Sequence, residues 1–376
     1  MNTRQRQGVR TVFPALSALP GIIVGCMVMT ALSSCVTTPQ QAAGKPRHHL
    51  ADGTYRNPQG SPADTATFAD MVAFFFRRMG DTPPRVPDDH VIAQSEALTA
   101  FNAAQGDDSI TWLGHAAFLL RLDGKLVLTD PYLTDVASPV AFGPKRYVQP
   151  GLPLDRIPEV DIILVSHNHY EHLDAKTVEQ LPGKDRVAVV VPLGLGEFFR
   201  SRGYANVTER DWYETVTVAD IEIEVLPAIH FSRRGLLDRN RTLWGGFAIR
   251  SGKRTVFHSG DTGYGPVFSE IGERAGPFDV ALIAIGAYEP ASIMKPVHVT
   301  PEEALQIASD IRARTAIGMH WGTVQLTDEP AFEPRSRLIA AARNSAWRNG
   351  RASVMRIGET RLFDDQIARS NRAERE

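Results

Sequence analysis

The sequence predicts a fold of the α/β (α+β) class, in which β-sheets carry helices on their outer faces. Short apolar and β-branched runs dominate from residue 109 onward, and further along the chain they alternate with helical patterns. The chain has 376 residues, 43% of them hydrophobic, so it can bury the core of one large domain or two ordinary ones. Its only two cysteines are Cys26 and Cys35, so this core must be stable without a disulfide scaffold.

The composition also excludes several classes of function. The formal net charge of −2 lacks the basic excess typical of nucleic-acid-binding proteins, so no nucleic-acid partner is expected. Because no cysteine follows Cys35, a thiol nucleophile and a cysteine-based zinc site are excluded from the rest of the chain. The chemistry there must rely on other side chains or on a metal, and the chain contains eleven histidines.

Residues 1–34 have the layout of a secretory signal peptide that ends in a lipobox at Cys35. Three arginines in the first ten residues precede an uncharged apolar stretch over residues 12–32. An uncleaved transmembrane anchor is the alternative, although two prolines within the stretch weaken it. We therefore expect an exported protein with a lipid on Cys35. Because Val36 is not Asp, known sorting rules favour the outer membrane, facing the periplasm, if the source is Gram-negative.

Residues 35–108 are expected to form a tether followed by a helical extension. The stretch 36–67 is rich in Pro, Gly, Gln, Ala and Thr, which indicates a loosely ordered segment. Phe68, Met71, Val72, Phe75 and Met79 fall on one face of a helix predicted over 68–79. This face either packs on the main domain or faces lipid.

The catalytic domain is expected over residues 109–365, followed by a polar tail at 366–376. Apolar runs predict strands at 109–113, 117–122, 125–129, 161–165, 187–191, 215–218, 221–226, 247–250, 254–258, 279–285 and 315–320, with Asp123–Gly124 as a hairpin turn. Helical patterns occur at 90–103, 174–181, 194–202, 266–274, 301–312 and 333–348. Thr300, Pro301 and Glu303 form the start signal of one of these helices.

A histidine cluster follows the predicted strand 161–165. His167, His169 and His172 lie in the sequence SHNHYEHLD, between a buried strand and a helix. A loop in this position can turn several side chains toward one point, and imidazoles suit zinc and similar transition metals. Three ligands leave a coordination position open for water, which is typical of a catalytic metal site.

Three further candidate ligands follow other predicted strands. His230, Asp261 and His320 each lie just past the carboxyl end of a strand, so all can converge on one edge of the sheets. Such a set can hold two metals about 3.5–4 Å apart with an aspartate between them. His48, His49, His90 and His258 are more simply explained as ordinary core or surface residues.

Motifs between residues 110 and 323 resemble the metallo-β-lactamase superfamily, whose signature is H-x-H-x-D-H, and most closely its N-acylphosphatidylethanolamine-hydrolysing phospholipase D family. They include TWLGHA at 111–116, TDP at 129–131, GPKR at 143–146, SHNHYEHLD at 166–174, LWGGFAIR at 243–250, GDTGY at 260–264, GPFD at 276–279, IGAYEP at 285–290, HVTPEEA at 298–304 and MHWGT at 319–323. YRNP at 55–58 is similar to the family's N-terminal segment.

The resemblance implies a four-layer αβ/βα sandwich, the metallo-β-lactamase fold, that holds two Zn²⁺ ions. The first zinc would bind His167, His169 and His230, the second would bind His172 and His320, and Asp261 would bridge them. Glu171 replaces the family's aspartate, which leaves the occupancy and identity of the second metal open.

Further roles follow if the protein is a phosphodiesterase. Asp261 would orient the attacking hydroxide, and His298 would contact substrate or support a ligand, with an ordinary loop position as its alternative. His115 and Asp130 would support the ligands from behind. Homodimers are compatible with the resemblance.

Three functions are compatible with these residues. The first is a membrane-associated phosphodiesterase of phospholipase D type, in which a metal-bridging hydroxide attacks N-acylated phosphatidylethanolamine or a related phospholipid. The second is a metal-dependent lactonase or esterase of the same fold. The third is a non-catalytic, metal-binding envelope lipoprotein, supported only by Glu171. In the first, the partners would be an amphiphilic phospholipid and the membrane that holds the N-terminal lipid.

Overall fold

The computed structural model describes residues 40–78, 82–140, 142–252, 254–344, 347 and 350–365, without the side chains of Phe68 and Phe75. The predicted signal peptide, Cys35 and the predicted tail at 366–376 lie outside the described residues. The chain from Gln40 onward belongs to one compact unit, which includes the described part of the predicted extension. Across the described ranges, no helix combines the length and the apolar character needed to cross a membrane.

The first sheet has seven strands, which lie in the order β14-β1-β2-β3-β4-β5-β6. Their bounds are Thr360–Leu362 (β14), Ser109–Gly114 (β1), Ala117–Leu122 (β2), Lys125–Thr129 (β3), Ile162–Leu164 (β4), Ala188–Pro192 (β5) and Asn206–Arg210 (β6). The strands from β14 to β3 pair antiparallel, and those from β3 to β6 pair parallel. Asp123 (φ +47°) and Gly124 (φ +76°) form the predicted hairpin turn between β2 and β3.

The second sheet repeats this plan in the order β13-β12-β11-β10-β9-β8-β7. Its strands are Arg351–Val354 (β13), Ala313–Met319 (β12), Phe278–Ala284 (β11), Arg254–His258 (β10), Gly246–Ser251 (β9), Ile221–Leu226 (β8) and Thr215–Val218 (β7). The strands from β7 to β10 pair antiparallel, and those from β10 to β13 pair parallel. Consequently β8, β10 and β12 run in the same direction and end at the same edge of the sheet.

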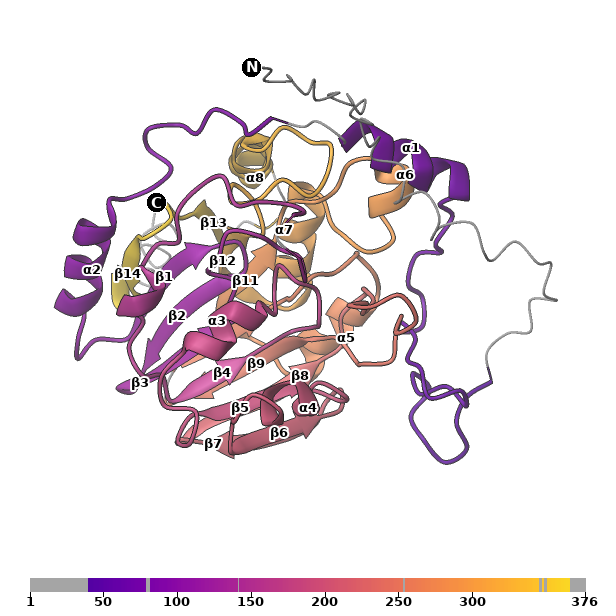
Figure 1. Ribbon diagram of the computed structural model, residues 1–376, viewed down its shortest axis with the longest axis horizontal. Helices are drawn as coiled ribbons and strands as arrows, with labels where there is room; N and C mark the ends of the chain where they lie inside the picture. The colour runs from indigo at the N-terminus through magenta and orange to yellow at the C-terminus, as the bar shows by residue number, and fades with distance from the viewer. Residues whose placement is uncertain are drawn as a thin grey trace, which may run out of the picture. The chain divides into compact units, whose positions relative to one another are not determined.

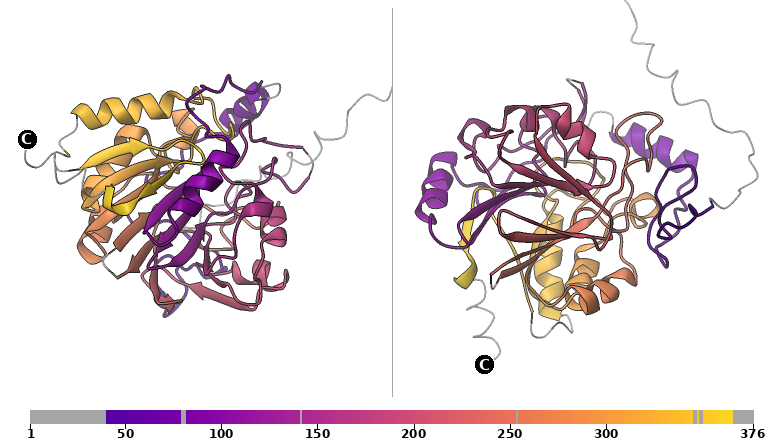
Figure 2. Two further views of the ribbon diagram at one scale, coloured as in Figure 1. Left: turned by 90° about the vertical axis from the view of Figure 1, so that its left-hand side faces the viewer. Right: turned by 90° about the horizontal axis from the view of Figure 1, so that it is seen from below.

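The two sheets face one another between outer layers of helix (Figure 1; Figure 2, right). Inward residues of both sheets share one core, exemplified by Leu120 and Ile249, whereas Leu119 points to the opposite side of its sheet. There it packs in a second core with α2 (Gln94–Ala103), α3 (Ala175–Gln180) and α4 (Gly196–Arg200). The helices α5 (Val267–Arg274), α7 (Pro301–Asp310) and α8 (Glu333–Asn344) cover the second sheet. The predicted αβ/βα sandwich is confirmed.

The elements that the sequence missed are short and polar. β6 (Asn-Val-Thr-Glu-Arg), β13 and β14 lie at or near sheet edges and carry weak apolar patterns, and α6 spans only Ala291–Met294. The helix predicted over 90–103 begins at Gln94, whereas the predicted start of α7 is confirmed by a complete capping box between Thr300 and Glu303. α8 is described to Asn344, and part of its predicted last turn lies outside the described residues.

Residues 40–60 form a strap that is held against the catalytic domain, contrary to the loose tether expected from composition. The backbone N–H of Tyr55 donates to the carbonyl oxygen of Asn240 at 2.9 Å. His48 and His49 each reach a carboxylate oxygen of Asp211. Composition missed this segment because a few specific polar contacts, not an apolar face, hold it in place.

The Phe-rich helix α1 (Phe68–Arg78) contacts α6 (Figure 1). Its predicted apolar face is not uniformly buried, because Met71 is 47% exposed while Val72 is partly buried. Phe76, which would widen the predicted apolar face, is 61% exposed.

Candidate metal centre

Four strand ends deliver the predicted ligands to one place. The loop after β4 carries His167, His169, Glu171 and His172. The second sheet contributes three more residues from its parallel-running strands β8, β10 and β12, namely His230, Asp261 and His320. All of them except Glu171 and His169 are almost completely buried.

Asp261 lies at the centre of these histidines. Its Oδ2 atom is 3.1 Å from Nε2 of His172 and 3.1 Å from Nε2 of His320. The same oxygen lies 3.8 Å from Nε2 of His230 and 3.9 Å from Nε2 of His167. A single carboxylate therefore faces two separate sets of imidazole nitrogens, which is the position that a bridging ligand requires.

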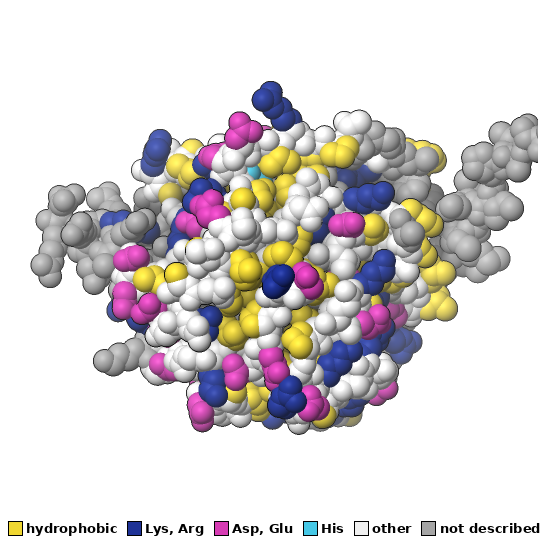
Figure 3. All heavy atoms as spheres, turned by 60° about the vertical axis from the view of Figure 1, so that its left-hand side comes forward, with side chains coloured by type: hydrophobic (Ala, Val, Ile, Leu, Met, Phe, Trp, Pro, Cys, Tyr) yellow, Lys and Arg dark blue, Asp and Glu magenta, His cyan; other side chains and the backbone are white. Residues whose placement is uncertain are grey.

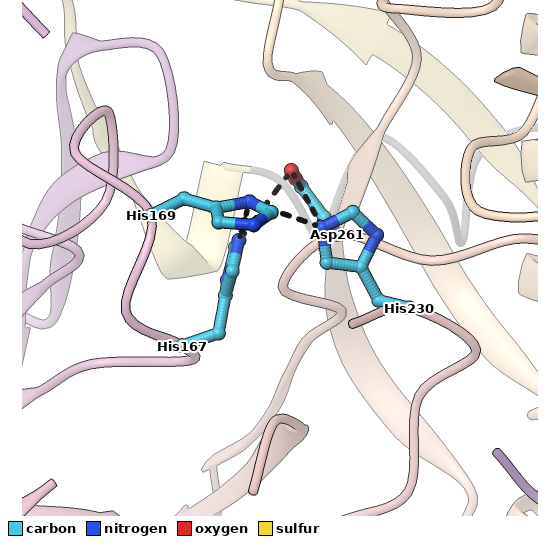
Figure 4. A group of neighbouring side chains, drawn as sticks. All are labelled: His167, His169, His230 and Asp261. Carbon is cyan, nitrogen blue, oxygen red and sulfur yellow. Dashed lines mark hydrogen bonds and ion pairs between the residues drawn. The ribbon is translucent and has the colours of Figure 1, made fainter. Parts of the chain in front are cut away.

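The first set consists of His167, His169 and His230 (Figure 4). Nδ1 of His169 is 2.9 Å from Nε2 of His167 and 3.3 Å from Nε2 of His230. Together with an Asp261 oxygen, these atoms all lie within 4.8 Å of one another, so they can surround one ion. Three nitrogens and one oxygen form a donor set that suits zinc and other borderline metals.

The second set contains His172, His320 and a carboxylate that differs from the family signature. Glu171 offers an oxygen within 4.8 Å of ligand atoms of His172 and Asp261. Its carboxylate also lies 3.9 Å from Nδ1 of His169, and its side chain is 17% exposed. The longer Glu side chain thus reaches the region between the two sets.

Asp130 orients two of the histidines through their Nδ1 atoms, directly for His172 and through Ser166 for His167. Its Oδ2 atom accepts hydrogen bonds from Nδ1 of His172 and from the hydroxyl of Ser166, both at 2.7 Å. The oxygen of Ser166 in turn lies 2.9 Å from Nδ1 of His167. If each Nδ1 carries the proton, both Nε2 lone pairs point toward Asp261. This is how outer hydrogen bonds commonly orient metal ligands.

Several buried polar atoms of this cluster lack hydrogen-bond partners within the described part of the chain. They include both carboxylate oxygens of Asp261, Nε2 of His172 and both ring nitrogens of His320. Although two of these contacts span only 3.1 Å, they are not directed as hydrogen bonds. Buried polar groups are rarely left unpaired, because the cost is about 1–3 kcal/mol each. The residues therefore fit a bound metal that would take these lone pairs.

Burial and neighbouring charges keep the rings of the first set neutral and Asp261 ionised, whereas the two nearby carboxylates favour the protonated form of His172 in the absence of a metal. Burial holds the pKa values of His167 and His230 well below the usual histidine value, so both rings are neutral at pH 7. Burial would raise the pKa of Asp261, but His172 and His320 outweigh it and hold this pKa well below its usual range. Burial would likewise lower the pKa of His172, but Asp261 and Asp130 outweigh it and raise that pKa.

His298 lies against the same carboxylate. It offers a nitrogen within 4.8 Å of ligand atoms of Asp261 and His320, and its ring lies 5.1 Å from that of His230. Its Nδ1 atom has no hydrogen-bond partner among the described residues. Burial lowers the pKa of His298 to about 3, so the ring is neutral and can donate one hydrogen bond.

His115 lies closer to the second set than a supporting residue needs to be. Its ring centre is 3.9 Å from that of His320 and 5.3 Å from that of His172, and both of its buried nitrogens lack partners in the described residues. It shares a group of possible ligand atoms with these two histidines. Its backbone N–H donates to Thr323, which fixes the turn after β1. The structure therefore adds His115 to the residues that face the second set.

Two residues that are not candidate ligands, Asn57 and Arg234, support the centre through hydrogen bonds. Asn57 in the strap accepts a hydrogen bond from the backbone N–H of His230 at 2.9 Å and another from the indole of Trp244 at 3.1 Å. The Nδ1 atom of His230 lies 3.0 Å from the carbonyl oxygen of Val297, which directs Nε2 toward the centre. The YRNP motif at 55–58 marked this asparagine, but nothing in the motif indicated its partner.

The second support is Arg234, which the sequence did not single out. Its guanidinium donates to the carbonyl oxygens of Asn168 at 3.0 Å and Leu173 at 2.7 Å, near the two ends of the ligand-bearing loop. The same group lies 4.0 Å above the ring of Tyr170. Burial lowers the pKa of Arg234 to about 10, which leaves it charged at pH 7. It therefore clamps the loop that carries four candidate ligands.

The remaining histidines lie apart from this centre or form hydrogen bonds with backbone groups. His48 and His49 contact Asp211 at 2.6 Å each. Burial would raise the pKa of Asp211, but these two contacts outweigh it and lower the pKa. His90 and His258 hydrogen-bond to backbone carbonyl groups, in keeping with their expected structural roles.

Comparisons with known proteins place the chain among metal-dependent hydrolases. The model of the β-lactamase superfamily domain matches residues 125–321, a span that contains all the ligands predicted for the two sets. N-acyl-phosphatidylethanolamine-hydrolyzing phospholipase D 1 of Caenorhabditis elegans is 43% identical over 241 residues, which cover 61% of this chain and 68% of that protein. A metal-dependent hydrolase of Caldivirga maquilingensis is 32% identical over 59% of this chain and 86% of its own length.

A solved structure supports the fold. The isothiocyanate hydrolase from Delia radicum gut bacteria superposes with a TM-score of 0.55 at 18% sequence identity. The match covers 68% of this chain and 99% of that structure. At this level of identity the likeness extends to the arrangement of strands and helices only.

Proposed function

The chain belongs to the β-lactamase superfamily and is a metal-dependent hydrolase, and from this premise we propose that it is a zinc-dependent phosphodiesterase of phospholipase D type. The proposed substrate is N-acylated phosphatidylethanolamine or a related phospholipid, as named for the relative from Caenorhabditis elegans. The observation that carries the proposal is the position of Asp261 between two sets of buried imidazoles.

The ligand sets suit a pair of zinc ions, with His167, His169 and His230 around one and His172 and His320 around the other. Bound metals would supply positive charge to the phosphate oxygens and lower the pKa of a water molecule. The protein's part is to hold these lone pairs rigidly and to exclude bulk water, which the burial of the cluster achieves.

In the proposed reaction, the oxygen of water bonds to phosphorus and the bond from phosphorus to the ethanolamine oxygen breaks. The departing oxygen takes up a proton, so the products are phosphatidic acid and an N-acylethanolamine. Asp261 is placed to orient the attacking oxygen, because its carboxylate faces both ligand sets. The neutral ring of His298, with its free Nδ1, is placed to hydrogen-bond a substrate oxygen.

We also propose that the protein is exported and held at the cell envelope by a lipid on Cys35. The support is the sequence of residues 1–35, with its charged start, apolar stretch and lipobox. A double-chain phospholipid stays in a membrane, so an anchored enzyme would meet its substrate without a soluble carrier. Mass spectrometry of the mature N-terminus tests this localisation, and an unmodified Cys35 contradicts it.

The substrate proposal is tested with the zinc-loaded full chain and N-acylated phosphatidylethanolamine in mixed micelles. The expected products are phosphatidic acid and N-acylethanolamine, and a chelator should stop their release. A matched preparation of Asp261→Asn should release neither. Turnover of a water-soluble lactone or carboxylic ester far above that of any phosphodiester would instead assign the protein to lactone or ester hydrolysis.

A further inference from the structure

The loop between β8 and β9 ends in an exposed turn of two leucines. Leu236 is 75% exposed and Leu237 is 92% exposed, more than the other large hydrophobic side chains among the described residues. The carboxylate of Asp238 accepts hydrogen bonds from the backbone N–H groups of Arg234 and Gly235, at 3.1 Å and 2.7 Å. The turn is therefore closed on itself, and its leucines project outward from a defined backbone.

This leucine turn is attached directly to the ligand-bearing loop. Arg234, at the base of the turn, clamps the carbonyl oxygens of Asn168 and Leu173. The backbone N–H of Arg233 donates to Oδ1 of Asn168 at 2.8 Å. A surface that receives the two leucines would thus lie beside the loop that carries His167 to His172.

The other exposed hydrophobic side chains belong to segments that are linked to this loop through one small cluster of side chains. Among the described side chains, the large hydrophobic residues that are exposed are Met71, Phe76, Val140, Phe142, Leu236 and Leu237. The segments that bear them are α1, the loop 133–146 and the leucine turn. A small cluster of side chains connects these segments, and it contains Tyr132, Ala137, Tyr170, Val324 and Leu326.

Specific contacts tie each segment to this cluster. Ala137 belongs to the loop that bears Phe142, and the hydroxyl of Tyr170 donates to the carbonyl oxygen of Arg234 at 2.8 Å. From α1, the guanidinium of Arg78 donates to the carbonyl oxygens of Gln325 and Thr327, which flank Leu326. Three segments with exposed apolar side chains are therefore linked, through this cluster, to Tyr170 of the ligand-bearing loop.

The leucine turn also carries a strong local excess of positive charge. Residues 231–243 contain four arginines and one aspartate, in a chain whose net charge is −2. Arg233, Arg239 and Arg241 are exposed. Arg239 lies 3.7 Å from Asp64, and Arg241 interacts electrostatically with Asp52. By contrast, the face shown in Figure 3 intermixes acidic and basic side chains.

We propose that the leucine turn docks on an anionic lipid bilayer, with Leu236 and Leu237 in the acyl region and the flanking arginines at the headgroups. An apolar tip within a collar of arginines matches the boundary between headgroup and acyl chain. Val140, Phe142 and α1 extend the contact around the ligand-bearing loop. This inference rests on the proposed lipid substrate. It adds that the enzyme takes its substrate from the bilayer surface on which the leucine turn docks.

Quenching by brominated lipids tests the proposal in the full chain bound to vesicles. Leu237→Trp places a fluorophore at the turn. Thr99→Trp places one on the exposed side of α2, which lies on the opposite side of Figure 1 from α1 and so outside the proposed contact. Both variants keep the same native tryptophans and the same N-terminal segment. On vesicles with brominated phosphatidylglycerol, we expect the first variant to be quenched at least about threefold more than the second. Equal quenching would overturn the proposal.

The charge requirement and the link to the site are tested separately. Quenching that is as strong on purely zwitterionic vesicles would overturn the assignment of an anionic surface. The alternative is that the chain binds a second copy of itself through the leucine turn. If it self-associates without lipid, and the double variant Leu236→Asp with Leu237→Asp abolishes this association, the lipid-docking proposal is overturned.

The same double variant should lower turnover of vesicle-bound substrate at least about tenfold more than turnover of dispersed short-chain phosphodiester. Quenching is measured without turnover, so it decides docking even if no phosphodiester proves to be a substrate.

Discussion

Two clusters in this molecule combine histidines with one aspartate, yet they are built for different purposes. At the candidate metal centre, Asp261 lies 3.1–3.9 Å from four imidazole nitrogens. In the strap, His48 and His49 lie 2.6 Å from the two oxygens of Asp211. We call this second group, His48, His49 and Asp211, the strap latch.

The distances separate the two roles. Zinc–nitrogen and zinc–oxygen bonds of about 2.0–2.2 Å in a tetrahedral arrangement hold neighbouring ligand atoms roughly 3.3 Å apart. The spacing around Asp261 agrees with that value, and its oxygens lack hydrogen-bond partners in the described residues. In the strap latch both distances are shorter, at 2.6 Å, and each Nε2 atom hydrogen-bonds to one oxygen of Asp211. An Nε2 atom that donates its proton to a carboxylate has no lone pair directed at Asp211. Similar residue types thus form a candidate metal centre in one place and a hydrogen-bonded contact in the other.

Replacing the central aspartates should give the largest contrast. We expect Asp261→Asn to reduce hydrolysis by roughly a thousandfold or more and to lower the bound metal, because ligands and the water they activate act as a unit. Asp211→Asn is the matched control, since it also removes a carboxylate that contacts two histidines. Paired metal analysis and initial rates measure both. Full activity in Asp261→Asn would refute the site assignment.

Asn57 connects the two regions, because it lies in the strap and holds the backbone of His230. We expect Asn57→Ala to weaken metal binding about tenfold or more, as loss of an outer support of a ligand commonly does. Titration with a zinc indicator gives the affinity. Gln59→Ala, in the same strap, is the control and should leave the affinity unchanged. If both variants bind zinc like the natural chain, the strap does not position this ligand.

The strap latch itself should affect stability but not metal content. We expect His48→Ala with His49→Ala to lower the free energy of unfolding by about 1–3 kcal/mol, since two hydrogen bonds to a partly buried carboxylate are lost. Denaturant unfolding gives this value, and metal analysis of the same sample gives the stoichiometry. Loss of one metal equivalent, with normal stability, would show that the strap latch is a metal site.

Replacement of Glu171 by aspartate should change the hydrolytic activity least. Aspartate at this position would match the family signature but is one methylene shorter, so we expect Glu171→Asp to keep or raise activity by a few fold at most. Glu171→Ala removes the carboxylate and should lower occupancy of the second ligand set. A large loss in Glu171→Asp would mean that the surrounding residues require the longer side chain.

The sequence was sufficient to predict the candidate metal ligands, because metal binding requires particular residue types and these follow apolar strands. The positions of His167, His230, Asp261 and His320 followed from apolar strands and from the ligand preference of transition metals. The convergence of these residues in the structure depends on β8, β10 and β12 running in the same direction. That direction was implied by the resemblance and not by the residue pattern alone.

What the sequence missed depends on single long-range contacts. Arg234 and Asn57 act through hydrogen bonds across about 60 and 170 positions of the chain, which no local periodicity reveals. The strap was predicted to be loose because its Pro, Gly and polar residues are typical of linkers. The exposure of Leu236 and Leu237 was equally hidden, because two apolar residues in a loop are compatible with burial.

The most direct test of the account is hydrolysis of N-acylated phosphatidylethanolamine in ¹⁸O-labelled water by the zinc-loaded full chain. If water attacks phosphorus at the centre around Asp261, the released phosphatidic acid should carry one ¹⁸O in its phosphate, and the N-acylethanolamine should carry none. Label in a free fatty acid, or the absence of phosphatidic acid while a lactone or carboxylic ester is hydrolysed, would contradict the proposed phosphodiesterase.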